Sequence, residues 1–110
     1  MSRKFERVEL NQTITVTDTI TNQRFGELVN LSAEGLMIMT DQQLTTHSIF
    51  QLCLQLPVAI AGRATIELGA DCLWCREAEN FNRYWSGFQI IDASDLAVQQ
   101  LAELTNQYQK

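Results

Sequence analysis

The basic residues of this chain are unevenly distributed along it. Arg3, Lys4 and Arg7 are three of the eight lysines and arginines in 110 residues, and the formal net charge is −5. Guanidinium groups form paired hydrogen bonds with phosphate oxygens and with the O6 and N7 edge of guanine. Two arginines four residues apart could therefore clamp a small anion. The alternative is an ordinary charged terminus in contact with solvent.

A second polar group occurs in the stretch NLSAEG, which covers residues 30–35. If the chain is extended up to Ser32, the side chains of Asn30 and Ser32 share one face. Both carry short hydrogen-bonding groups, and Gly35 allows a backbone angle or a close approach that a side chain would prevent. These residues could bind a polar ligand at a strand end, or they could form an ordinary hairpin turn.

The stretch CLWC at residues 72–75 has the spacing of a redox or zinc pair. On a regular strand, however, Cys72 and Cys75 face opposite sides of the sheet. A redox pair also needs its second cysteine in a helix, and a structural zinc site needs four ligands. We therefore expect ordinary thiols and no metal. Trp74, which should face opposite to Leu73 and Cys75, is either a core residue or a stacking surface for a purine.

The sequence offers little for catalysis or for large polyanions. The single histidine, His47, lies in a polar stretch without an orienting partner, so we expect no catalytic residues. The acidic balance argues against a broad nucleic-acid surface. The sequence contains no apolar window as long as a membrane span and no secretory leader. We therefore expect a cytoplasmic protein with reduced cysteines and no membrane insertion.

Alternating apolar and polar residues predict about six strands, with Gly69 as a bulge in the fifth. These strands cover residues 13–17, 24–31, 35–40, 49–57, 64–78 and 83–91. Their spacing is typical of a barrel or a sandwich.

The apolar spacing then changes to that of an amphipathic helix, capped by Asp92 or Ser94. Its apolar face would contain Ala97, Leu101, Leu104 and Tyr108. We expect a single all-β domain, 1–110, with a flexible N-terminal arm at 1–7, a barrel at 8–91 and a helix at 92–108.

The two polar motifs together are more specific than either alone. Arg-x-x-x-Arg just before the first strand, followed by Asn-x-Ser-x-x-Gly at the end of the next long strand, resembles the PilZ domain family. The Leu-Trp pair at 73–74, the stretch SGFQI at 86–90 and the closing helix are also similar to that family. The resemblance implies a six-stranded antiparallel β-barrel with a C-terminal α-helix. It also implies a non-enzymatic bacterial receptor that binds cyclic di-GMP on the outside of the barrel.

The resemblance further implies roles for single residues. Arg3 and Arg7 would bind phosphate and guanine, and Lys4, at a place where a further arginine is common, would add charge. A guanine would be hydrogen-bonded by Asn30, in place of the commoner aspartate, and by Ser32. Gly35 would keep the turn open, and Trp74 would stack near a guanine.

The sequence therefore predicts a cytoplasmic receptor for cyclic di-GMP that needs no cofactor and signals to an unidentified downstream protein. One alternative is a PilZ-like adaptor that binds protein without nucleotide. Another is a binder of single-stranded nucleic acid, disfavoured by the acidic composition and the few aromatic residues. The pathway, the number of ligands per site and the oligomeric state stay open.

Overall fold

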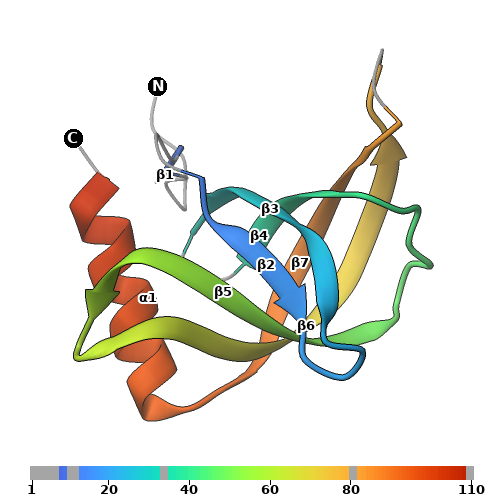
Figure 1. The fold of residues 1–110 in the computed structure, drawn as a ribbon. Helices are drawn as coiled ribbons and strands as arrows, with labels where there is room; N and C mark the ends of the chain where they lie inside the picture. Colours follow the sequence, from blue (N-terminus) through green and yellow to red (C-terminus); the bar gives the residue numbers. More distant parts are fainter. Residues whose placement is uncertain (1–7, 10–12, 33–34, 80–81, 109–110) are drawn as a thin grey trace.

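The computed structural model describes residues 8–9, 13–32, 35–79 and 82–108 and forms a barrel with one helix beside it (Figure 1). The strands and the helix are, in chain order, β1 (Val8–Glu9), β2 (Thr15–Asp18), β3 (Gln23–Leu31), β4 (Gly35–Thr40), β5 (Ile49–Ile60), β6 (Arg63–Glu77), β7 (Tyr84–Ala93) and α1 (Asp95–Tyr108).

The sheet closes on itself. Its strand order is β1-β3-β2-β5-β6-β7-β4, all neighbours are antiparallel, and a further pairing between β3 and β4 completes the circle. Six strands form the barrel, as predicted, and the predicted strands agree with the observed ones to within a few residues. The two-residue β1 was not predicted. It pairs with the C-terminal end of β3, on the same edge that pairs with β2 further back along the strand. The opposite edge of β3 pairs with β4.

The alternation of the strands fills the barrel with apolar side chains. In β5, for example, Leu52, Leu54 and Leu56 point inward and are at most 8 % exposed. Three phenylalanines, Phe25, Phe50 and Phe88, pack with ring centroids 5.1–6.2 Å apart. A bulge lies at the predicted level of the sheet but on the neighbouring strand. Gly69 lies opposite Asp92 and Ala70 opposite Ile90, so the extra residue is Ile91 on β7 and not Gly69 on β6.

Two tight turns set the register of the hairpins. The β5–β6 turn consists of Ala61 and Gly62, both with positive φ, which matches the twist of two-residue hairpins. In the β2–β3 turn, Asp18 accepts hydrogen bonds from the backbone N–H groups of Ile20 and Thr21 at 2.8 and 3.2 Å. Asn22 there has a φ of 60°, which asparagine tolerates better than most residues.

The helix begins three residues later than the expected boundary at 92, because β7 continues to Ala93. Ser94 is its N-cap and accepts a hydrogen bond from the N–H of Ala97 at 3.0 Å. Ala97, Leu101 and Leu104 are buried as predicted, whereas the side chain of Tyr108 lies outside the described residues. Of the helices in the described part of the chain, none is long and apolar enough to cross a membrane.

Candidate functional site

The strand β1 lies beside the second polar motif. Val8 lies opposite Leu31 and Glu9 opposite Asn30. Arg7 is bonded to Val8, so the chain enters the barrel one residue away from the backbone position of Ser32. Arg3, Lys4 and Arg7 themselves lie outside the described residues.

Ser32 and Gly35, which flank the connection between β3 and β4, are closely packed. The N–H of Ser32 donates a hydrogen bond to the carbonyl of Gly35 at 3.0 Å, and Ser32 is 4 % exposed. A Cβ added to Gly35 would overlap the backbone carbonyl oxygen of Phe88 on β7. Gly35 therefore serves a close approach of two strands, which is one of the two uses predicted for it.

Two described residues of the predicted site, Asn30 and Trp74, are the ends of a row across the outside of the barrel. Asn30 on β3 lies opposite Met37 on β4, Met37 opposite Gly87 on β7, and Gly87 opposite Trp74 on β6. Three strand spacings separate Asn30 from Trp74, which corresponds to about 14 Å along the curved sheet. Glu9 on β1 lies opposite Asn30, so the row begins where the N-terminal segment enters the sheet.

Asn30 is held in this row by an irregularity in β3. The register shifts between Leu28 and Asn30, which leaves Val29 as an extra residue. Bulges of this kind redirect side chains and are frequent beside functional sites. Asn30 is half-buried, and its amide nitrogen lies 3.8 Å from the sulfur of Met37.

At the other end of the row, a second bulge turns Trp74 outward. The register of β6 shifts between Cys72 and Trp74, so Leu73 is the extra residue and both Leu73 and Trp74 are exposed. The nitrogen side of the indole contacts the backbone of Gly87, where an added Cβ would overlap it. Arg76 places its guanidinium carbon over the indole, 5.3 Å from the ring centroid. Neither Arg76 nor Gly87 was among the site residues predicted from the sequence, although Gly87 lies in the stretch SGFQI that resembles the family.

The same bulge overturns the expectation that Cys72 and Cys75 face opposite sides of the sheet. The extra residue changes the alternation, so Cys72 is fully buried and Cys75 also packs against the core. For the same reason Trp74 does not face opposite to Leu73, since both side chains are exposed, whereas it does face opposite to Cys75 as expected. Burial raises the pKa of the Cys72 thiol, which lowers its thiolate population at neutral pH.

The contacts of the cysteine thiols are those of ordinary packed residues. The sulfur of Cys75 accepts hydrogen bonds from the N–H of Leu44 and the hydroxyl of Ser86, each at 3.4 Å. Within the described ranges, no three His, Cys, Asp or Glu side chains are placed to hold a metal ion. All three cysteines are free.

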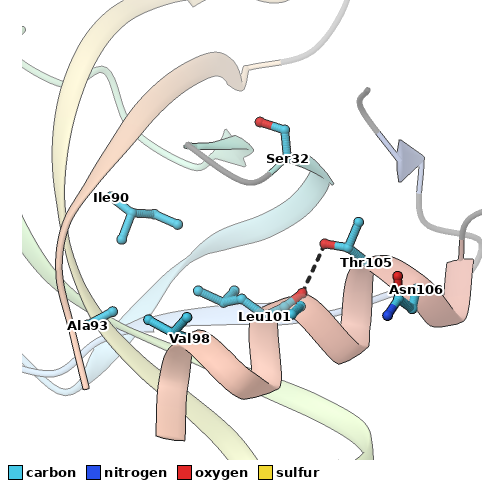
Figure 2. Close-up of a pocket in the computed structure, with 8 residues that line it drawn as sticks. Ser32, Ile90, Ala93, Val98, Leu101, Thr105 and Asn106 are labelled. Carbon is cyan, nitrogen blue, oxygen red and sulfur yellow. Dashed lines mark hydrogen bonds between the residues drawn. The ribbon is translucent and has the colours of Figure 1, made fainter. Parts of the chain in front are cut away.

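A largely apolar cavity of about 340 Å³ separates the β3–β4 turn from the helix (Figure 2). Ser32 lies on one side of it, Ile90 and Ala93 of β7 on another, and α1 below. The helix contributes Val98, Leu101, Ala102, Thr105 and Asn106. Of the described motif residues, Ser32 is the one that lines this cavity.

The sequence of the chain matches the profile of the PilZ domain over residues 1–107. The chain belongs to the PilZ domain family. A search of curated proteins finds no significant match to this PilZ domain.

Solved structures of low sequence identity share its fold. The inhibitor of motility MotI/DgrA of Bacillus subtilis superposes with a TM-score of 0.72 and 15 % identity, over 97 % of this chain and 50 % of that chain. The PilZ domain of Escherichia coli YcgR, solved with c-di-GMP, gives a TM-score of 0.71 and 14 % identity over 98 % and 92 % of the two chains. This PilZ domain thus spans half of MotI/DgrA and nearly all of the YcgR domain.

Proposed function

We propose that this PilZ domain is a receptor for cyclic di-GMP, which binds to the outer surface of the barrel. The observation that carries the proposal is the row from Asn30 to Trp74, with the entry of the N-terminal segment beside its first residue. The similar PilZ domain of YcgR was solved with c-di-GMP, which supports the choice of ligand.

In this proposal the two motifs act on different parts of the ligand. Arg3 and Arg7 donate paired hydrogen bonds to phosphate and to guanine, and Lys4 adds positive charge. Asn30 and Ser32 hydrogen-bond a guanine beside the β3–β4 turn. Asn30 has one carbonyl acceptor, so it accepts from one of the N–H groups on the guanine edge where an aspartate could accept from two.

Gly35 and Trp74 supply surface to the proposed site. Gly35 lets the turn pass close to β7, so that no side chain rises from the strand at this point. Trp74 is 37 % exposed and supports a base at the far end of the row. The site so formed binds and orients a ligand and has no group assigned to bond making or breaking, which suits a receptor better than an enzyme.

The signal would pass to another protein. Ligand closure changes the surface around the N-terminal segment, and a partner that prefers the closed surface is selected by it. Among proteins of similar fold, MotI/DgrA is named as an inhibitor of motility, and MrkH, which superposes with a TM-score of 0.67 and 11 % identity, as a transcription regulatory factor. Proteins of this fold therefore serve different outputs. We leave the partner of this chain unassigned and propose a protein rather than a nucleic acid.

Titration calorimetry with cyclic di-GMP tests the proposal directly. We expect a dissociation constant of about 1 μM, equivalent to about 8 kcal/mol, and far weaker binding of GMP and GTP. The same titration gives the number of ligands per chain. An absence of heat and of any NMR chemical-shift change at about 100-fold excess over that constant contradicts the receptor and leaves the nucleotide-independent adaptor.

A further inference from the structure

Arg76 stands beside the proposed site without belonging to either motif. It lies on β6 two residues after Trp74, so both side chains project from the outer face of the barrel. Its guanidinium carbon lies over the Trp74 ring at 5.3 Å from the centroid, within the range of a cation–π contact. An aromatic ring that holds a guanidinium in place reduces the rotamer freedom lost when that group binds a ligand.

The guanidinium of Arg76 is available to a ligand, in contrast to those of Arg24 and Arg83. Arg24 and Arg83 both form ion pairs with Glu27 and Asp41. Among the described residues, Arg76 forms no ion pair, and its guanidinium contacts the ring of Trp74. Arg63 lies at the β5–β6 hairpin, away from the row. Arg76 is therefore the described arginine that could meet a ligand spread along the row.

We propose that Arg76 is a further ligand-binding residue that donates to O6 and N7 of the guanine at the Trp74 end of the row. This inference rests on the proposed function. Cyclic di-GMP contains two guanines joined through a ribose–phosphate ring, so it needs two base sites, and the Asn30 end supplies one of them. A guanidinium fork matches the two adjacent acceptors of guanine, whereas adenine has an amino donor in place of O6.

The hybrid ligand cyclic GMP–AMP separates this role from general attraction of phosphate. Its guanine can occupy the Asn30 end, which leaves its adenine at Arg76. We expect the parent protein to bind cyclic di-GMP about tenfold or more tightly than the hybrid, since paired contacts to a base discriminate at this level. In Arg76→Ala the two ligands should bind within about threefold of each other, because the discriminating fork is lost.

Two further variants sharpen the test. Arg76→Lys keeps the charge but cannot form the fork, so its preference for cyclic di-GMP should also collapse. Arg63→Ala removes the same charge at the distant hairpin and should keep the parent preference. Unfolding temperatures of all variants should agree closely, because Arg76 is exposed.

Each other result contradicts the inference. If Arg76→Ala weakens both ligands equally, the arginine contacts phosphate and not a guanine edge. If its binding equals that of the parent, or if Arg76→Lys behaves as the parent does, the fork is absent. If the parent itself binds neither ligand, the proposed function fails and the inference with it, whereas the first two results leave the receptor function intact.

Discussion

Trp74 and Gly87 form a matched pair on the outer surface of the barrel. The residues lie opposite each other on β6 and β7, and the indole occupies the space that a side chain at position 87 would need. Glycine inside a strand is otherwise unfavourable, because it loses much conformational freedom and adds no packing. Its presence here is explained by the ring that covers it, which links the identity of one residue to the position of another.

The pair can be tested by a double-mutant cycle. Gly87→Ala in the parent should lower the free energy of unfolding by about 1–3 kcal/mol, because the new methyl group overlaps the indole. In a Trp74→Ala background the same change should be neutral or slightly stabilising, since a residue with a Cβ is favoured in a strand. Urea unfolding of the four proteins gives the coupling energy. Equal effects of Gly87→Ala in both backgrounds would show that the indole does not depend on the glycine.

At the scale of elements, the sequence predicted the strands well and their irregularities poorly. Alternation fixed the six barrel strands, because one face of each strand is buried. The bulges at Val29 and Leu73 depend on how neighbouring strands pair, which the sequence does not display. Missing the bulge at Leu73 produced the wrong faces for Cys72 and Cys75. The row from Asn30 to Trp74 could not be predicted either, since it combines the registers of four strands.

The helix contains a buried polar residue that its apolar spacing does not predict. Its apolar spacing correctly gave Ala97, Leu101 and Leu104, but the pattern takes no account of Gln100, which is 2 % exposed. The side-chain amide of Gln100 donates to the carbonyls of Ile60 and Thr65 at 3.2 and 2.9 Å. A polar residue therefore connects α1 to the β5–β6 hairpin, where an apolar one would be expected from periodicity alone.

Removal of this connection should be costly. Gln100→Leu keeps the approximate volume but removes the donor from the buried hydrogen bond to Ile60 and from the part-buried one to Thr65. We therefore expect a loss of about 1–3 kcal/mol in the free energy of unfolding. Gln99→Leu, at the exposed neighbouring position, should change stability by less than about 0.5 kcal/mol. Urea denaturation of both variants checks the difference. A Gln100→Leu protein as stable as the Gln99→Leu control would mean that the two carbonyls find other partners.

At the scale of the whole molecule, charge is arranged so that few cations are available to a ligand. The chain carries a net charge of −5. Hydrogen bonds to Glu27 and Asp41 raise the pKa of Arg24, and Arg83 lies 3.7–3.8 Å from the same two carboxylates. Those arginines balance local acids. Among the described cations, Arg76 is the one beside the row, and the proposed function adds the charges of Arg3, Lys4 and Arg7.

Under the proposed function, this distribution makes the N-terminal segment the main source of affinity for the anionic ligand. In the proposed mechanism the segment closes over the ligand and is ordered by it. Ordering costs about 1–2 kcal/mol of backbone entropy per residue, which the new contacts must exceed. Charge-assisted hydrogen bonds contribute about 1.5–3 kcal/mol each, so the loss of one arginine should weaken binding about tenfold or more.

Hydrogen exchange and thermal unfolding measure this closure together. We expect amides at residues 3–7 to exchange rapidly in the free protein and to be protected at saturating cyclic di-GMP. The unfolding temperature should rise as well, because the ligand binds only the folded state, which is stabilised by about 2.7 kcal/mol at a hundredfold excess over the dissociation constant. Arg3→Ala and Arg7→Ala should each reduce both effects at a fixed ligand concentration, whereas Arg63→Ala should retain them. Rapid exchange at residues 3–7 in a saturated complex would rule out the clamp, and binding would then have to come from the row on the barrel and from Arg76.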